Sequence, residues 1–215
     1  MYQSSLLYLI LLISVFAMGC AKQVYTADID TSYYRINKRN KKDQDLEKII
    51  RPYRSQLDAK MNKVIAQNSV EMVKAKPNST LGNWFADAIL EEARYVSKKK
   101  VDIALQNYGG IRVPSLKAGE ITVGNIYELM PFDNKLVLLT MDGNLLQKLL
   151  DRVTEKGGWP ISGSLKFTMD GTKAKDIRVN NKPMVKSEKY VVAIADYIAD
   201  GGDQCFFLDQ AERED

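Results

Sequence analysis

The feature that most constrains this chain is a short apolar segment that ends in two adjacent glycines. Residues 101–105 read Val-Asp-Ile-Ala-Leu, and residues 107–112 read Asn-Tyr-Gly-Gly-Ile-Arg. A short apolar run bounded by turn residues predicts a buried strand. Because glycine has no Cβ, Gly109 and Gly110 allow a tight turn or a close approach of the backbone to a ligand. We therefore expect the domain to be organised around a buried strand with a glycine corner at its end.

Two polar side chains flank this corner and make it a candidate binding site. Asn107 follows the strand and can both donate and accept hydrogen bonds. Arg112 presents a planar guanidinium group that suits phosphates and vicinal hydroxyls. An ordinary turn with a solvent-facing arginine explains the same residues, so this stretch alone leaves both interpretations open.

Composition indicates one main domain and restricts the chemistry it can perform. The chain has 215 residues, 45% of them hydrophobic, with a formal net charge of +4 and no histidine. The charge is small and dispersed, so we expect no nucleic-acid partner. The absence of histidine excludes Ser-His-Asp triads, Cys-His dyads and histidine-based metal sites. We expect neither a catalytic residue nor a metal ligand in this chain.

Four further residues are interpreted as structural. Asp102, Glu120 and Asp142 lie in different predicted elements without the spacing of metal ligands, so we expect them at the surface or in turns. Cys205 is expected to be a small buried residue.

The N-terminus has the pattern of a bacterial lipoprotein. Residues 6–18 are almost continuously apolar, which is short for a membrane span and typical of a signal peptide. Residues 17–20, Ala-Met-Gly-Cys, resemble a lipobox, in which the cysteine is lipidated after cleavage. A plain signal peptide with an incidental thiol is the alternative. We expect a signal peptide over residues 1–19 and a lipid anchor on Cys20, which would place the protein on a membrane of the bacterial cell envelope, facing the periplasm or the cell surface.

Residues 20–45 and 46–215 differ in character. The first segment is polar, is rich in charged residues and shows no apolar period, so it predicts a tether. The second is the expected domain. It opens with apolar residues at three- and four-residue spacing over residues 46–65, which predicts an amphipathic helix that is kinked or broken at Pro52.

The rest of the domain mixes helices and strands without a regular repeat. Further helices are expected to start near residues 78–80, with Trp84 and Phe85 in the core, and over residues 123–130 and 145–153. Strands are expected over residues 69–73, 135–141, 165–169, 176–179, 190–195 and 206–208. This order predicts an α/β or α+β mixed fold with an antiparallel or mixed sheet.

Five short motifs also occur in a characteristic order. They are Leu-Gly-Asn with Ala-Asp-Ala at residues 81–88, the corner at 107–112, Met-Pro-Phe-Asp-Asn at 130–134, Ser-Gly at 162–163 and Ala-Asp-Gly-Gly-Asp at 199–203. Together they resemble the C-terminal domain of the 5'-nucleotidase and UDP-sugar hydrolase family. Each motif is weak alone, whereas five in order over residues 46–210 are strong. The resemblance implies a four-layer α/β/β/α domain that binds a nucleotide.

The resemblance assigns roles to two aromatic residues and one carboxylate. Phe132 and Tyr197 match the pair that sandwiches the base, and Asp203 matches the carboxylate that accepts the ribose hydroxyls. Without the resemblance, core packing would explain both rings and capping of its own turn would explain Asp203.

Polar and glycine residues complete the implied site. Asn107 and Asn134 match ligands near the base and sugar, Arg112 matches an arginine that points at ribose or phosphate, and Gly109 and Gly110 form the corner. Before residue 81, where the family tends to have an arginine, this chain reads Lys-Ala-Lys at residues 74–76. A lysine can replace the arginine as a point charge but not as a bidentate fork.

The metallophosphatase domain of the family has no counterpart in this sequence, which lacks its Asp-x-His and Gly-Asn-His-Glu motifs. The resemblance therefore implies the nucleotide-binding half of a split 5'-nucleotidase, with the divalent metal pair in a separately encoded metallophosphatase chain. A surface lipoprotein that binds nucleosides or nucleotides without catalysis is the alternative. A structural or dimerisation module with a vestigial pocket is a third interpretation.

Overall fold

The computed structural model describes residues 31–37 and 40–214. The expected signal peptide, Cys20 and the first part of the tether lie outside the described residues. The chain divides into a unit of residues 1–44 and a unit of residues 45–215. In the first unit, residues 31–37 and 40–43 form no helix or strand and are exposed.

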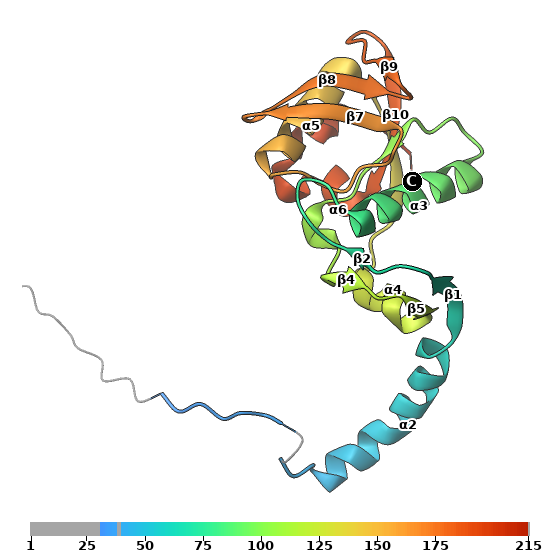
Figure 1. Cartoon of the computed structure of the whole chain (residues 1–215), viewed down its shortest axis with the longest axis vertical. Coiled ribbons are helices and arrows are strands. Elements are labelled where there is room, and N and C mark those ends of the chain that lie inside the picture. Colours follow the sequence, from blue (N-terminus) through green and yellow to red (C-terminus); the bar gives the residue numbers. More distant parts are fainter. Residues whose placement is uncertain (1–30, 38–39, 215) are drawn as a thin grey trace, which may run out of the picture. The chain divides into compact units, whose positions relative to one another are not determined.

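Helix α2, Gln44–Met61, opens the second unit and is cyan in Figure 1. It continues through Pro52 and has no buried residue. It ends before residue 65, because the β-branched pair Val64 and Ile65 starts strand β1, Val64–Asn68, which pairs with β5. Large apolar side chains on this helix remain more than half exposed: Leu46, Ile49, Tyr53 and Leu57.

The central sheet has four strands in the order β11-β6-β10-β3. Their bounds are Glu212–Glu214, Leu136–Asp142, Lys189–Ala195 and Ile103–Ala104. Strand β10 runs antiparallel to β6 and parallel to β3. The mixed sheet expected from the sequence is therefore confirmed.

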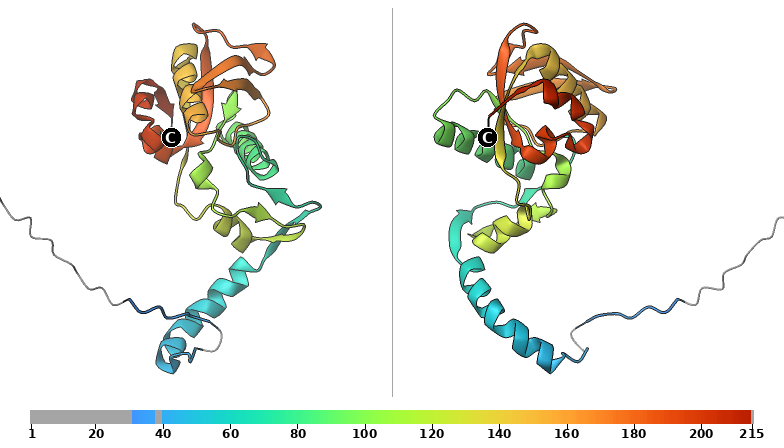
Figure 2. Two further views of the ribbon diagram at one scale, coloured as in Figure 1. Left: turned by 60° about the vertical axis from the view of Figure 1, so that its left-hand side comes forward. Right: turned by 180° about the vertical axis from the view of Figure 1, so that it is seen from behind.

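Two helices cover opposite faces of strand β10 (Figure 2). Val192 and Ile194 belong to the large core cluster with residues of α5, Gly143–Glu155. Ala193 instead packs in a separate cluster with residues of α3, Thr80–Ser97. Successive side chains of a strand point to opposite faces, so the alternation explains why one strand is buried on both sides.

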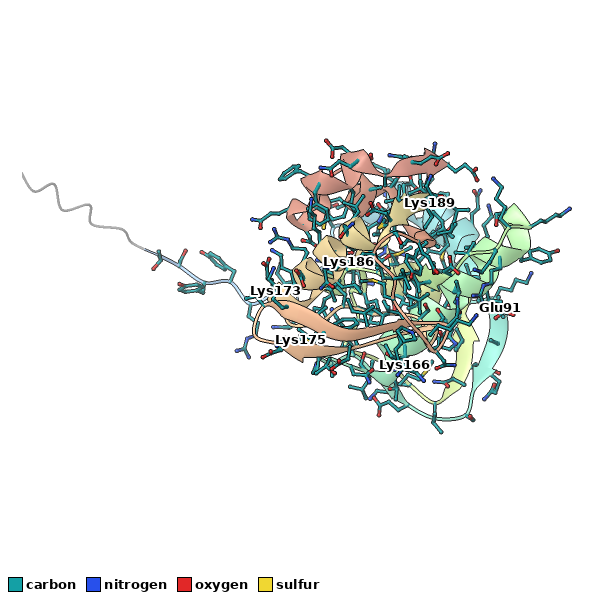
Figure 3. The ribbon with its side chains drawn as sticks, turned by 90° about the horizontal axis from the view of Figure 1, so that it is seen from above. Glu91, Lys166, Lys173, Lys175, Lys186 and Lys189 are labelled. Carbon is teal, nitrogen blue, oxygen red and sulfur yellow. The ribbon has the colours of Figure 1, made fainter. Side chains whose placement is uncertain are left out.

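A second, three-stranded sheet packs on α5. It consists of β7 (Leu165–Asp170), β8 (Lys173–Val179) and β9 (Lys182–Pro183). Asp170 and Gly171 stand at the turn between β7 and β8, where Gly171 has a φ of +58°; an Asp-Gly pair between two strands is a typical hairpin signal. Three lysines of this hairpin, Lys166, Lys173 and Lys175, are labelled in Figure 3.

A smaller group of elements surrounds the start of α3. It comprises the strands β2 (Met72–Val73), β4 (Ser115–Leu116) and β5 (Gly119–Thr122) and the helix α4 (Val123–Leu129). A separate core cluster of Leu81, Ile111, Leu116, Ile121 and Leu129 joins them. Ser79 caps α3, since its Oγ accepts a hydrogen bond of 3.1 Å from the backbone N–H of Gly82.

Three expectations about single elements were wrong. Residues 206–208 are not a strand, because the chain forms a 3₁₀ helix, η3, over Phe206–Gln210 that buries Leu208. The strand expected over 69–73 is reduced to the two residues of β2. Trp84 is 37% exposed, because the buried side of α3 passes through Leu81, Ala86 and Leu90 instead.

Over residues 31–37 and 40–214, no helix is both long enough and apolar enough to cross a bilayer.

Candidate functional site

A pocket of about 400 Å³ is lined by all eight residues that the sequence assigned to the nucleotide site. They are Asn107, Gly109, Gly110, Arg112, Phe132, Asn134, Tyr197 and Asp203. These residues come from four places: the corner after β3, the loop between α4 and β6, helix α6 (Asp196–Ala199) and the 3₁₀ turn η2 (Gly202–Gln204). Residues almost a hundred positions apart therefore converge on one concave surface, the usual form of a small-molecule site.

The Ser-Gly motif lies elsewhere and has a structural role. Ser162 Oγ accepts a hydrogen bond of 2.9 Å from the backbone N–H of Ala104. Gly163 donates its N–H to Asp87 Oδ1 at 2.7 Å. Both residues line a different cavity of about 440 Å³ between α3 and β7. The motif ties β3 and α3 to the chain before β7, and so it supports the corner from outside the pocket.

The glycine corner is a single 3₁₀ turn, η1, over Tyr108–Gly110. Its N–H at Gly110 donates to the carbonyl oxygen of Asn107 at 3.0 Å. A Cβ added to Gly110 would lie 2.0 Å from Gln106 Nε2. Glycine therefore leaves the space that the Gln106 side-chain amide occupies in this structure.

Both aromatic rings of the pocket are open to solvent. Phe132 is 44% exposed and Tyr197 is 48% exposed. The core-packing explanation is therefore wrong for both residues. The guanidinium carbon of Arg112 lies 5.6 Å from the centroid of the Phe132 ring, within the range of a cation–π contact. Arg112 Nη1 also donates to the carbonyl oxygen of Gly109 at 3.3 Å.

The carboxylate of Asp203 is held from the opposite side of the pocket. Asn107 Nδ2 donates to Asp203 Oδ2 at 2.8 Å. Asp203 has a φ of 52°, a left-handed conformation that non-glycine residues adopt mainly in turns and at ligand sites. A Cβ on Gly202 would lie 2.6 Å from the Tyr197 ring, so this glycine lets the loop pack flat against the aromatic residue.

Gln106 was missed by the sequence interpretation. Its side chain is buried, at 1% exposure, and its Nε2 donates to Asn107 Oδ1 at 2.8 Å. The signal was present in the sequence, because an amide side chain directly follows the buried apolar run. A buried amide requires hydrogen-bond partners, and this one finds its partner in a residue of the pocket.

A cluster of cations lies beside the corner. Lys74 Nζ is 3.9 Å and Lys76 Nζ is 4.6 Å from the centroid of the Tyr108 ring. Lys74 also donates to the carbonyl oxygen of Ile111 at 2.6 Å. Partial burial, followed by the charges of Arg112 and Lys76, lowers the pKa of Lys74 from its usual value. Arg112 lines the pocket, and the two lysines lie over the neighbouring Tyr108 ring, so the corner carries a positive field that favours an anion.

Acidic residues outside the pocket have structural roles. Asp102 is 4% exposed, which corrects its expected place at the surface; its Oδ2 accepts from the N–H of Val191 at 3.0 Å. Asp142 caps α5 by accepting from the N–H of Leu145 at 2.8 Å. In the described part of the chain, no group of three His, Cys, Asp or Glu side chains could hold a metal ion.

Cys205 is fully buried, as expected, and burial raises the pKa of its thiol to about 11. Desolvation penalises the thiolate, which is the reactive form of cysteine. The residue therefore acts as part of the core behind the Asp203 loop.

Comparison with known proteins identifies the family. The model of the "5'-nucleotidase, C-terminal domain" family matches residues 59–210. Protein UshA of Yersinia enterocolitica is 26% identical over 191 residues, covering 85% of this chain. A 5'-nucleotidase of Vibrio vulnificus is 27% identical and covers 76% of this chain. The crystal structure of a 5'-nucleotidase precursor from Thermus thermophilus superposes with a TM-score of 0.67 at 29% identity, over 79% of this chain.

The chain belongs to the family of 5'-nucleotidase C-terminal domains. It spans 34%, 30% and 37% of the lengths of these three proteins, respectively. Its relatives thus contain a long further portion that the match does not include.

Proposed function

We propose that this chain, as a 5'-nucleotidase C-terminal domain, is the nucleotide-binding half of a split 5'-nucleotidase. It would hold the base and ribose of a 5'-nucleotide while a separately encoded metallophosphatase chain hydrolyses the phosphate ester. The observation that carries the proposal is the pocket of about 400 Å³, which unites the complete set of residues implied by the resemblance.

Each wall of the pocket is proposed to hold one part of the ligand. A base would stack between the half-exposed rings of Phe132 and Tyr197, since aromatic faces bind bases of any kind. Asp203 has only acceptor oxygens when ionised and would receive the hydroxyls of the ribose. The phosphate would extend towards Arg112 and the neighbouring cation Lys74.

The chemical step is proposed to use groups from the partner chain. A pair of divalent metals in that chain would generate the nucleophile from water and neutralise charge on the phosphate. The sequence of this chain has no histidine. Its own contribution is to bind and orient the nucleotide, and orientation alone can lower a reaction barrier substantially.

Helix α2 offers a surface for this partner. Leu46, Ile49, Tyr53 and Leu57 are each more than half exposed along one side of the helix. Contiguous exposed apolar side chains of this kind are typical of protein–protein contacts. In the sequence, α2 includes residue 59, where the family match begins. The resemblance places the metallophosphatase domain of the family N-terminal to this domain, so α2 is proposed to lie on the side of that partner.

The lipid anchor on Cys20 is part of the same proposal. An anchor of several acyl chains holds a protein stably on a membrane, whereas a single chain holds it weakly. The tether of residues 20–45 would then let the domain reach a partner on the same membrane. Confinement raises the effective concentration of the two chains, so that a weak contact suffices.

Calorimetric titration of the full chain in detergent with AMP, adenosine and UDP-glucose tests the binding role. Saturable binding of at least one of them is expected, and the absence of heat with all three would refute the proposal. Addition of a metallophosphatase chain that lacks its own C-terminal domain then tests the split enzyme. Stimulated hydrolysis is expected, whereas binding without stimulation by any such chain would favour the surface lipoprotein that only captures nucleotides.

A further inference from the structure

We propose that Gln106 is a positioning residue that makes the pocket selective for a ribose with free hydroxyls. It acts through Asn107, which in turn orients the carboxylate of Asp203. The inference rests on the proposed nucleotide-binding function and adds a specificity element to it.

The three side chains form a directed relay of hydrogen bonds. Gln106 Nε2 donates to Asn107 Oδ1 at 2.8 Å, and Asn107 Nδ2 donates to Asp203 Oδ2 at 2.8 Å. Gln106 is 1% exposed and Asn107 is 7% exposed, so water competes little for the bond between them. The bond to Asp203 is part-buried, because Asp203 lines the pocket. Buried hydrogen bonds of this kind polarise one another and specify one arrangement.

Gln106 determines which end of the Asn107 amide faces the carboxylate. An amide has a donor end and an acceptor end of nearly the same shape, so the Asn107 side chain could turn by 180° without a steric penalty. The donor on Gln106 fixes the oxygen of Asn107 on the inner side. The nitrogen must then face Asp203. With the amide reversed, Asn107 Oδ1 would face Asp203 Oδ2. Repulsion between these two acceptor oxygens would displace the carboxylate.

Gly110 provides the space for this relay. A Cβ at this position would lie 2.0 Å from Gln106 Nε2 and 2.9 Å from Asn107 Oδ1. The hydrogen bond between the two amides therefore passes directly under the glycine. Gly110 leaves room for the Gln106 side chain in this position.

The direction of the Asp203 carboxylate determines which ligands the pocket can bind. Asn107 holds one carboxylate oxygen and thereby fixes the direction of the group in the pocket. A fixed carboxylate accepts from two neighbouring hydroxyls, whereas a rotated one does not. We therefore expect the relay to contribute to binding of nucleosides with a free 2',3'-diol and to contribute little for ligands without it.

Gln106→Glu tests the relay with almost no change of shape. At alkaline pH, where the introduced carboxyl is ionised despite its burial, it presents an acceptor to Asn107 Oδ1, so the Asn107 amide should reverse. We expect affinity for adenosine to fall on the order of tenfold, the effect of one hydrogen bond to a charged group. Affinity for 2',3'-dideoxyadenosine should stay within about twofold of the native protein. Unchanged binding of adenosine, or an equal loss for both ligands, would overturn the proposal.

The pH dependence of this variant separates positioning from damage to the fold. Protonation of the introduced carboxyl restores a donor towards Asn107, so adenosine affinity relative to the native protein should recover as pH falls towards 5. Gly110→Ala, which displaces the Gln106 amide sterically at a residue that lines the pocket, should weaken adenosine binding without recovery at low pH. Gln67→Glu on β1, an exposed position outside the pocket, is the matched control and should change neither affinity.

Nuclear magnetic resonance of the protein without ligand tests the relay independently of nucleoside binding. The side-chain amide resonances of Asn107, identified by their absence in Asn107→Asp, report its hydrogen bond to Asp203. We expect them to shift in Gln106→Glu and in Gly110→Ala but not in Gln67→Glu. Unshifted resonances would overturn the relay even if the native protein bound no nucleoside, an outcome that would separately refute the proposed function.

Discussion

Asn107 and Asp203 are 96 positions apart in the sequence and are joined by a hydrogen bond of 2.8 Å from Nδ2 to Oδ2. The bond connects the glycine corner after β3 with the turn that follows α6. Asn107 directly precedes η1, and Asp203 lies in the 3₁₀ turn η2 with a left-handed φ, so the site depends on two turns next to the central sheet. Binding groups on loops that a rigid scaffold positions are common in enzymes and binding proteins.

Removing either aromatic ring should weaken nucleotide binding without unfolding the protein. We expect Phe132→Ala and Tyr197→Ala each to cost roughly 1–3 kcal/mol of binding free energy, the usual contribution of a base stacked on an aromatic ring. The melting temperature should change little, because both rings are about half exposed. Titration calorimetry and thermal denaturation measure the two effects. Tyr95→Ala, at an exposed aromatic residue of α3, is the control; a sharp loss of stability in both pocket variants would instead identify core residues.

The isolated chain should hydrolyse no phosphate ester, even with added Mg²⁺, Mn²⁺ or Zn²⁺. Metal-assisted hydrolysis requires a site of fixed ligands, and the described residues contain no suitable group of three. Phosphate release from AMP is the measurement, with the metal present and after chelation. Release that depends on the metal and scales with the amount of chain would contradict the division of labour proposed above.

The preference for AMP over adenosine should decline at alkaline pH. Burial and nearby cations lower the pKa of Lys74, so its positive charge is present below that pKa and is lost as pH rises through it. The affinity for AMP should therefore begin to fall at a lower pH than it would if a lysine of ordinary pKa held the phosphate. Lys74→Met should weaken AMP binding at neutral pH and flatten this part of the profile, while adenosine binding stays constant. An unchanged pH profile in the variant would show that Lys74 does not contact the phosphate.

The exposed side of α2 should be required for the partner and not for the nucleotide. Ile49→Glu and Leu57→Glu place charges among apolar side chains that are more than half exposed. We expect nucleotide affinity and stability to be unchanged and stimulation of a metallophosphatase chain to be lost. Ser55→Glu is the matched control. Because successive residues of an α-helix are turned by 100°, Ser55 lies on the opposite side of α2 from the apolar side chains. Equal stimulation by all three variants would exclude α2 as the contact surface.

Lipidation should determine where the protein acts. We expect Cys20→Ser to move the chain out of the membrane fraction and to lower cellular 5'-nucleotidase activity, with unchanged nucleotide affinity. Fractionation, the processed size of the chain and activity of whole cells are the measurements. A variant that stays in the membrane fraction at the native processed size would argue against the lipobox.

Most helices and strands were predictable because their signals are local. The Asp-Gly turn marked the β7–β8 hairpin, and Ser79 was among the caps expected for α3. Predictions were poor where local pattern and tertiary packing disagree. The apolar residues 206–208 suggested a strand, but they form a 3₁₀ helix that buries Leu208 in the core.

The sequence by itself determined the family, the mixed fold and the eight residues that line the pocket, because short motifs in order carry that information. Only the tertiary structure decided how these residues act on one another. It showed that Asn107 holds Asp203, that Gln106 directs Asn107, and that Gly110 is needed to accommodate Gln106. The physical reason is that hydrogen bonds depend on distance and direction between atoms, and chain folding brings those atoms together from segments that share no sequence pattern.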